Sequence, residues 1–138
     1  MTSRVLGFDY GEQRIGVASG QTITGSATPL TTLNAVNQQP DWARIEQLIG
    51  EWQPEALVVG IPTLLDGTET PATQRAQRFA RQLEGRFQLP VYRIDENLSS
   101  IEAEQQLKKN KKLGQHNKQE IDKMSAAIIV QRWLEQST

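Results

Sequence analysis

A short apolar run near the start of the chain ends in a carboxylate, and few folds accommodate that combination. Val5, Leu6 and Phe8 are the bulky or β-branched residues typical of a strand buried on both faces, and Asp9 follows them directly. A carboxylate at the tip of a core strand is unfavourable unless a cation or several hydrogen-bond donors compensate it. The run therefore predicts a central strand that carries Asp9 to a functional site. A turn cap is the alternative for Asp9, because Asp favours turn positions.

The rest of the chain alternates between strand-like apolar runs and helical periodicity. Gly11 permits a turn, so a first strand at about residues 4–10 forms an antiparallel hairpin with a second at about 14–20. Pro29 lacks a backbone donor and makes the third strand, at 27–33, an edge strand. The later elements are a helix from Pro40-Asp41 to Trp52, a buried strand at 56–61 closed by Pro62, a helix at 71–87, a strand at 91–94, a helix from Ser99 or Ser100 to Leu107, and a last helix at 119–136. This order predicts a single α/β domain over residues 1–138, with a mixed sheet that is antiparallel at its start and parallel later.

The composition narrows the chemistry that the chain can perform. It has no cysteine and one histidine, His116, which excludes disulfides, thiolate catalysis and metal sites rich in His or Cys. Any bound metal must therefore have oxygen ligands, which Mg²⁺ and Mn²⁺ prefer. The formal net charge is −1, so a nucleic-acid partner would have to meet a locally basic face. Because there is neither a long apolar run nor a signal-peptide core, we expect a cytoplasmic protein with no membrane partner.

Three carboxylates occupy positions from which they could reach one site. Asp9 and Glu96 each follow an apolar strand, and parallel strands bring their carboxyl ends to the same edge of a sheet. Asp122 shares a face of the last helix with Ala126 and Ile129, although an acid near a helix start can also simply interact with the helix dipole. Three converging acids need a compensating cation, because like charges at close range cannot all stay ionised. Two Mg²⁺ or Mn²⁺ ions would suit the hydrolysis of a phosphodiester bond.

Basic side chains near Asp122 offer a surface for the phosphates of a nucleic acid. Six lysines fall within sixteen residues that contain two acids, and they are Lys108, Lys109, Lys111, Lys112, Lys118 and Lys123. Arg75, Arg78 and Arg81 recur at three-residue intervals along the helix at 71–87 and could add a second basic surface. Each phosphate contact would make binding sensitive to salt. A solvated lysine loop is the alternative for the lysine run.

The motifs taken together resemble those of the YqgF family, relatives of the RuvC-type Holliday-junction resolvases. The matching segments run in order over nearly the whole chain, and they are 8–11, 14–18, 59–62, 66–69 and 95–100, followed by Lys118, Ile121, Asp122 and 125–127. The resemblance implies an RNase H-like fold with the sheet order 3-2-1-4-5. It also implies a nuclease that matures the 5′ end of pre-16S ribosomal RNA. By position, Asp9, Glu96 and Asp122 match the acidic metal ligands of the family.

One position departs from the family pattern beside the second acid. The family usually has Glu-Arg-Leu-Ser-Thr here, whereas this chain has Asn97 in place of the arginine and Ser100 in place of the threonine. Serine keeps the hydroxyl group of threonine. Asn97 removes a fixed positive charge, so phosphate binding or the stabilisation of charge in the transition state could be weaker.

We therefore predict a metal-dependent endonuclease that acts on structured RNA, with Asp9, Glu96 and Asp122 as catalytic and metal-binding residues. The predicted nucleic-acid contacts are Lys108, Lys109, Lys111, Lys112, Lys118, Arg75 and Arg78. A resolvase of branched DNA is one alternative, and it would need two active sites. A nucleic-acid-binding factor without catalysis is another, which Asn97 and the modest net charge favour. The sequence leaves open whether the protein is a monomer or a weak homodimer.

Overall fold

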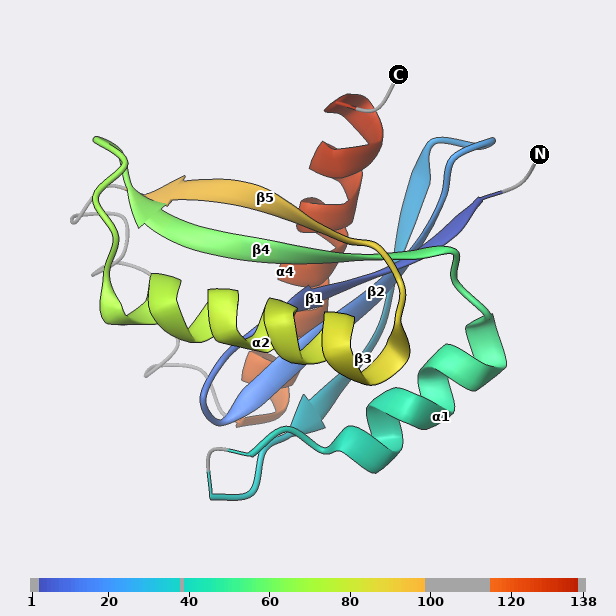
Figure 1. The fold of residues 1–138 in the computed structure, drawn as a ribbon, viewed down its shortest axis with the longest axis horizontal. Coiled ribbons are helices and arrows are strands. Elements are labelled where there is room, and N and C mark those ends of the chain that lie inside the picture. Colours follow the sequence, from blue (N-terminus) through green and yellow to red (C-terminus); the bar gives the residue numbers. More distant parts are fainter. Residues whose placement is uncertain (1–2, 38, 99–114, 137–138) are drawn as a thin grey trace.

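The computed structural model of this chain describes residues 3–37, 39–98 and 115–136 (Figure 1). Five strands form one mixed sheet in the order β3-β2-β1-β4-β5. They are β1 (Arg4–Asp9), β2 (Arg14–Gln21), β3 (Ser26–Asn34), β4 (Ala56–Leu64) and β5 (Val91–Leu98). The first three strands pair antiparallel, whereas β1 with β4 and β4 with β5 pair in parallel. The mixed sheet predicted from the sequence is confirmed, and so is the strand order that the family resemblance implies.

The described helices cover both faces of this sheet. They are α1 (Trp42–Trp52), α2 (Pro71–Phe87) and α4 (Gln115–Gln136). Figure 1 shows α1 and α2 on one side of the strands and α4 crossing the other side. The five-stranded sheet flanked in this way is the RNase H-like arrangement that the motifs implied.

Alternation along the strands builds a separate apolar core on each face. Leu6 and Phe8 of β1 face α1 and α2, and the rings of Phe8 and Phe79 meet edge to face with centroids 5.7 Å apart. Val5 of β1 packs instead in the second core, with Ile129 of α4. Successive residues of a strand point to opposite faces, so the residue after Phe8 points toward α4. That residue is Asp9.

Two strands extend beyond the ends predicted from the sequence. Pro62 does not close β4, which continues to Leu64. The backbone N–H of Leu57 donates to Pro90 on the β5 side, so by alternation the nitrogen of Pro62 lies on the β1 side. The pairing of β1 with β4 ends at Val59, and the missing donor of Pro62 therefore breaks no ladder bond. β5 likewise continues past residue 94, and Glu96 lies inside the strand rather than after it.

The last helix also begins earlier than predicted. α4 starts at Gln115, so Asp122 lies beyond its first turn and the helix-dipole interpretation of that residue is wrong. The predicted helix from Ser99 or Ser100 to Leu107 lies outside the described residues. No helix in the described part of the chain is long and apolar enough to cross a membrane.

Candidate active site

Asp9 lies at the last position of β1, on the face of the sheet that α4 covers. In the antiparallel register it is opposite Gly16 of β2, and paired residues point to the same face. A Cβ on Gly16 would collide with the backbone oxygen of Asp122 in α4. The glycine is required there because α4 crosses β2 at backbone contact. Asp9 is therefore directed toward the segment of α4 that carries Asp122.

Glu96 reaches the same face from β5. Ile94, two residues earlier, packs in the core under α4, so Glu96 points the same way. A Cβ on Gly60 of β4 would lie 2.9 Å from Oε2 of Glu96 and 2.5 Å from Cδ1 of Ile129. The absence of a side chain at Gly60 thus leaves the space that the Glu96 carboxylate and Ile129 fill.

Asp122 is held by a cation from the hairpin. Nε of Arg14, the first residue of β2, donates a hydrogen bond to Oδ2 of Asp122 over 2.7 Å. The two side chains are 16% and 20% exposed, so this ion pair is sheltered from solvent far more than a surface pair. Only one carboxylate oxygen of Asp122 takes part in the recorded bond. Arg14 therefore fixes the orientation of the carboxylate while it compensates part of its charge.

The three acids interact electrostatically. Burial raises the pKa of Asp9 to about 8, and the negative charges of Glu96 and Asp122 add to the shift. Burial also raises the pKa of Glu96, which the positive charge of Arg132 on α4 partly offsets. At neutral pH without a bound cation, the carboxyl group of Asp9 therefore keeps its proton. A cation placed among the three acids would favour the ionised form of Asp9.

The donor chemistry of these residues suits a hard divalent cation. All three side chains offer carboxylate oxygens, which Mg²⁺ and Mn²⁺ prefer, and a positive ion would offset the burial and the negative charges that raise the pKa of Asp9. Within the described ranges, no three acidic or His side chains are gathered closely enough to hold one ion as they stand. Asp122 is meanwhile engaged with Arg14. The three side chains thus have the ligand atoms that such a metal ion prefers, but in this structure they lie too far apart to bind one ion together.

The predicted basic contacts fall in different places. Lys108, Lys109, Lys111 and Lys112 lie outside the described residues, and Lys118 belongs to α4 with a side chain that is also outside them. The side chain of Asn97 is outside them as well. Arg75 and Arg78 are exposed on α2, across the sheet from α4. They line a cavity that also includes Tyr10, the residue directly after Asp9.

Two cations at this site were not predicted from the sequence. Arg14 contacts Asp122, and Arg132 is close enough to Glu96 to lower its pKa. Arg14 is the first residue of β2, which pairs with the strand that carries Asp9. Its position in the sequence therefore indicated that a cation lies near the hairpin. No pattern in the sequence connects Arg132 to Glu96, because only the crossing of α4 over the sheet brings them together.

Comparison with known proteins gives a consistent result. A sequence model of the RuvX family, described as Holliday junction resolvase, matches residues 3–136. A Pseudomonas putida protein named "Putative pre-16S rRNA nuclease" is 48% identical over 135 residues, which cover 97% of this chain and 96% of the relative. A Legionella pneumophila protein of the same name is 48% identical over 132 residues, which cover 96% of this chain and 95% of the relative. RuvX is another name of the YqgF family, so the family that the motifs resembled is confirmed.

A solved structure of a resolvase is a more distant match. RuvC of T. thermophilus, in complex with a Holliday junction substrate, is 18% identical to this chain. The alignment covers 67% of this chain and 64% of RuvC, with a TM-score of 0.48.

Proposed function

This chain belongs to the RuvX family, and from that membership we propose that it is a nuclease, specifically a metal-dependent endonuclease that processes the 5′ end of pre-16S ribosomal RNA. The single observation that carries the catalytic part is the pKa of Asp9, which burial, Glu96 and Asp122 raise to about 8. An acid buried beside two other acids at a sheet edge is what a cation-dependent site requires and what a purely structural role would avoid. The name carried by relatives that are 48% identical supports the RNA substrate. The same proposal places the protein in the cytoplasm with that substrate.

Asp9, Glu96 and Asp122 would hold the Mg²⁺ or Mn²⁺ in this proposal. When bound, divalent ions supply the activation of water and the stabilisation of the leaving oxygen that phosphodiester hydrolysis needs. Arg14 keeps the carboxylate of Asp122 in one orientation through the bond to Oδ2. Gly16 lets α4 approach β2 closely at the position that pairs with Asp9. The lysines at 108–112 and Lys118 would bind the RNA backbone, as expected from their charge.

Replacement of one acid tests the catalytic proposal. Asp9→Asn should lower the cleavage of a labelled pre-16S 5′ fragment in Mg²⁺ by about 10²-fold or more, because several kcal/mol of charge stabilisation are lost. Asp95→Asn is the matched control, since it removes the same charge one residue from Glu96 on the opposite face of the strand. Circular dichroism and a thermal melt should show that both variants are folded. Full activity of the Asp9→Asn protein would refute the proposal.

A second substrate is favoured by the family description, which is Holliday junction resolvase. The same preparation should therefore be given a four-way DNA junction and the RNA precursor at equal Mg²⁺ concentration. Preferential cleavage of the RNA supports the proposal, whereas symmetrical cleavage of the junction would assign the site to branched DNA. Sedimentation adds a second criterion, because a resolvase needs two active sites and hence a dimer. Tight, salt-dependent RNA binding without any metal-dependent product would instead identify a non-catalytic binding factor.

A further inference from the structure

A small polar cavity lies across the sheet from the three acids. Its volume is about 120 Å³, so it can admit a phosphate group and the edge of one base but not a duplex. It is lined by Tyr10, Glu12, Asn37, Gln39, Pro40, Arg75, Arg78 and Gln82. These residues come from the turn after β1, from the connection between β3 and α1, and from α2. The cavity is therefore formed by three segments that meet beside the end of the Asp9 strand.

The cavity carries a positive charge that a ligand could use. Nε of Arg75 pairs with Oε1 of Glu12 over 2.8 Å, but the two side chains are 45% and 41% exposed, so the pair is weak. Arg78 is exposed one helical turn further along α2, and it makes no ion pair with any described residue. Two guanidinium groups and one carboxylate leave one net positive charge. A guanidinium group is well suited to a phosphate, to which it can donate two parallel hydrogen bonds.

Amide side chains complete the lining. Asn37, Gln39 and Gln82 each offer an N–H donor and a carbonyl acceptor, which is the pattern that reads the edge of a nucleobase. Asn37 has a φ of 53°, and reciprocal backbone hydrogen bonds between Val36 and Gln39 close the loop around it.

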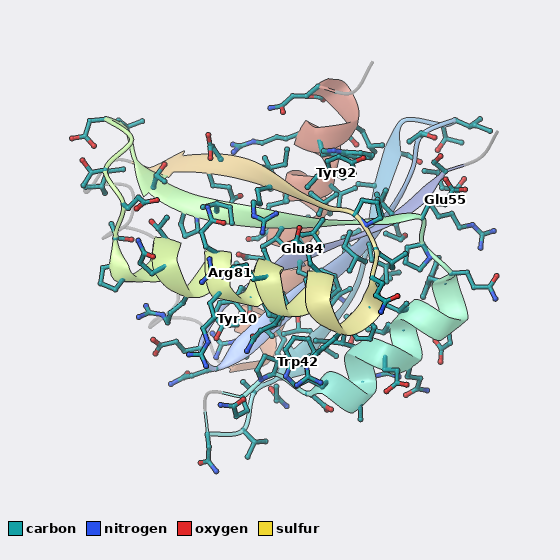
Figure 2. All side chains as sticks on the ribbon, viewed as in Figure 1. Tyr10, Trp42, Glu55, Arg81, Glu84 and Tyr92 are labelled. Carbon is teal, nitrogen blue, oxygen red and sulfur yellow. The ribbon has the colours of Figure 1, made fainter. Side chains whose placement is uncertain are left out.

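The wall of the cavity rests on the apolar core. The ring of Tyr10 packs against Phe79 with centroids 4.9 Å apart, and the ring of Trp42 stacks on the same Phe79 at 5.7 Å. Figure 2 shows Tyr10 and Trp42 at the lower edge of α2 and Glu84 at its upper edge. A site built on rigid elements loses little conformational entropy when it binds.

We propose that this cavity holds part of one unpaired nucleotide of the RNA strand that is cut at the acids, with the phosphate on Arg75 and Arg78 and the edge of the base on the amides. The inference rests on the proposed nuclease function and adds to it a subsite for single-stranded RNA. Tyr10 follows Asp9 directly, so the strand can pass from the acids around the end of β1 onto α2. An acidic peptide would use the arginines alone, whereas a nucleotide uses both the arginines and the amides.

The test compares two arginines of the same helix. Arg78 lines the cavity, whereas Arg81 does not line it and instead acts on Glu84. Binding of a fluorescent single-stranded RNA to the full-length protein is measured by anisotropy in a chelator, which prevents cleavage, at several salt concentrations. Arg78→Ala should weaken binding about tenfold and reduce the salt slope by about 0.7, the value expected for the loss of one phosphate contact on a single strand. Arg81→Ala removes the same charge and should change the affinity by less than about twofold.

A charge-neutral variant separates the amides from general electrostatics. Gln82→Ala should weaken binding of the single strand several-fold and leave the salt slope unchanged, because no phosphate contact is lost. A fully paired RNA stem of the same length should respond to neither Arg78→Ala nor Gln82→Ala. A melt of each variant confirms that the exposed substitutions leave the fold intact.

The outcomes separate this inference from the proposed function. Equal effects of Arg78→Ala and Arg81→Ala would overturn the subsite, while continued cleavage of the RNA precursor in Mg²⁺ would leave the nuclease proposal standing. A wild-type protein that neither binds nor cleaves RNA would overturn both. Displacement of the RNA by a poly-glutamate peptide, lost in Arg78→Ala and unaffected by Gln82→Ala, would assign the cavity to an acidic peptide instead.

Discussion

Arg14 and Asp122 form a contact across 108 positions of the sequence, and it decides how the third acid is presented. Asp122 would be free to rotate without a partner, because it stands on a helix above the sheet. The 2.7 Å bond from Nε of Arg14 to Oδ2 leaves the other carboxylate oxygen for a further interaction. Carboxylates that bind metals are commonly oriented by such a hydrogen bond from a neighbouring residue. Arg14 is therefore a positioning residue in the proposed site.

Arg14→Gln should weaken the site without removing a ligand. We expect a loss of about 10–100-fold in Mn²⁺ affinity, measured by isothermal titration, with a similar loss in cleavage. Arg14→Lys should restore part of the affinity, because it keeps the charge but not the planar geometry. Arg93→Gln is the control, since Arg93 pairs with the exposed Glu84 away from the acids. Unchanged metal affinity in Arg14→Gln would contradict the positioning role.

The residues of the site were predictable from the sequence to different degrees. Asp9 stands out because a carboxylate interrupts a core strand, and Glu96 follows the same logic on β5. Asp122 is identifiable by its apolar helical face, but its partner Arg14 is not, because an ion pair between distant segments leaves no local pattern. The predicted roles of the three acids and of the basic residues stay predictions until they are measured.

At the scale of elements, α2 was easier to predict than the ends of β4 and β5. α2 begins at Pro71 and ends at Phe87 as predicted, because a proline in the first turn and the apolar spacing mark it locally. The extension of β4 past Pro62 depends on where the neighbouring β1 stops, which is a property of the sheet and not of the segment. The length of β5 also depends on its neighbour. Its polar residues after Ile94 continue the strand because they pair with β4.

The crossing of α4 over β2 makes Gly16 the most sensitive position of these elements. Gly16→Ala places a methyl group against the backbone oxygen of Asp122, which can move only if α4 moves. We expect a loss of about 1–3 kcal/mol in the free energy of unfolding, measured in urea, and a fall in cleavage because Asp122 is displaced. Gly50→Ala is the contrast, because it lies in α1 with nothing within 4 Å of the new Cβ. It should stabilise the protein by about 0.5–1 kcal/mol. Equal stability of the two variants would show that α4 can adjust freely.

At the scale of the whole molecule, the sheet separates two kinds of chemistry. The acids lie on the α4 face, and the cavity with Arg75 and Arg78 lies on the α2 face. The end of β1 joins them, because Asp9 points to one face and Tyr10 lines the cavity on the other. A polyanion at the end of β1 can therefore contact Arg75 and Arg78 on one face of the sheet while one of its phosphodiester groups faces the acids on the other. This local arrangement allows such binding although the formal net charge of the chain is −1.

The burial of Asp9 beside two other acids should be visible in the stability of the entire metal-free chain. Asp9 has a folded-state pKa of about 8 against an ordinary value of 3.8, so the unfolded chain releases this proton first. The free energy of unfolding should therefore fall as pH rises from about 4 to 8, by up to about 1.4 kcal/mol per pH unit. Measurements above pH 5 avoid the acid range in which Glu84, whose pKa Arg93 lowers, loses its own contribution.

Urea unfolding of the wild type and two variants in a chelator tests this expectation. The measurements are made at about pH 5.5 and pH 8, which lie within the range in which the pKa shift of Asp9 affects stability. Asp9→Asn should remove most of the pH dependence of the free energy of unfolding. The variant should also be more stable than the wild type at pH 8, because an amide carries no charge to bury. Asp95→Asn should follow the wild type, since Asp95 is exposed on the other face of β5.

Mg²⁺ should restore the stability of the wild type at pH 8 but not of Asp9→Asn, because a ligand that binds the folded state alone stabilises it by mass action. A wild type with the same pH dependence as Asp9→Asn would mean that neither burial nor the neighbouring acids raise the pKa of Asp9, and the case for a cation among the three acids would be lost.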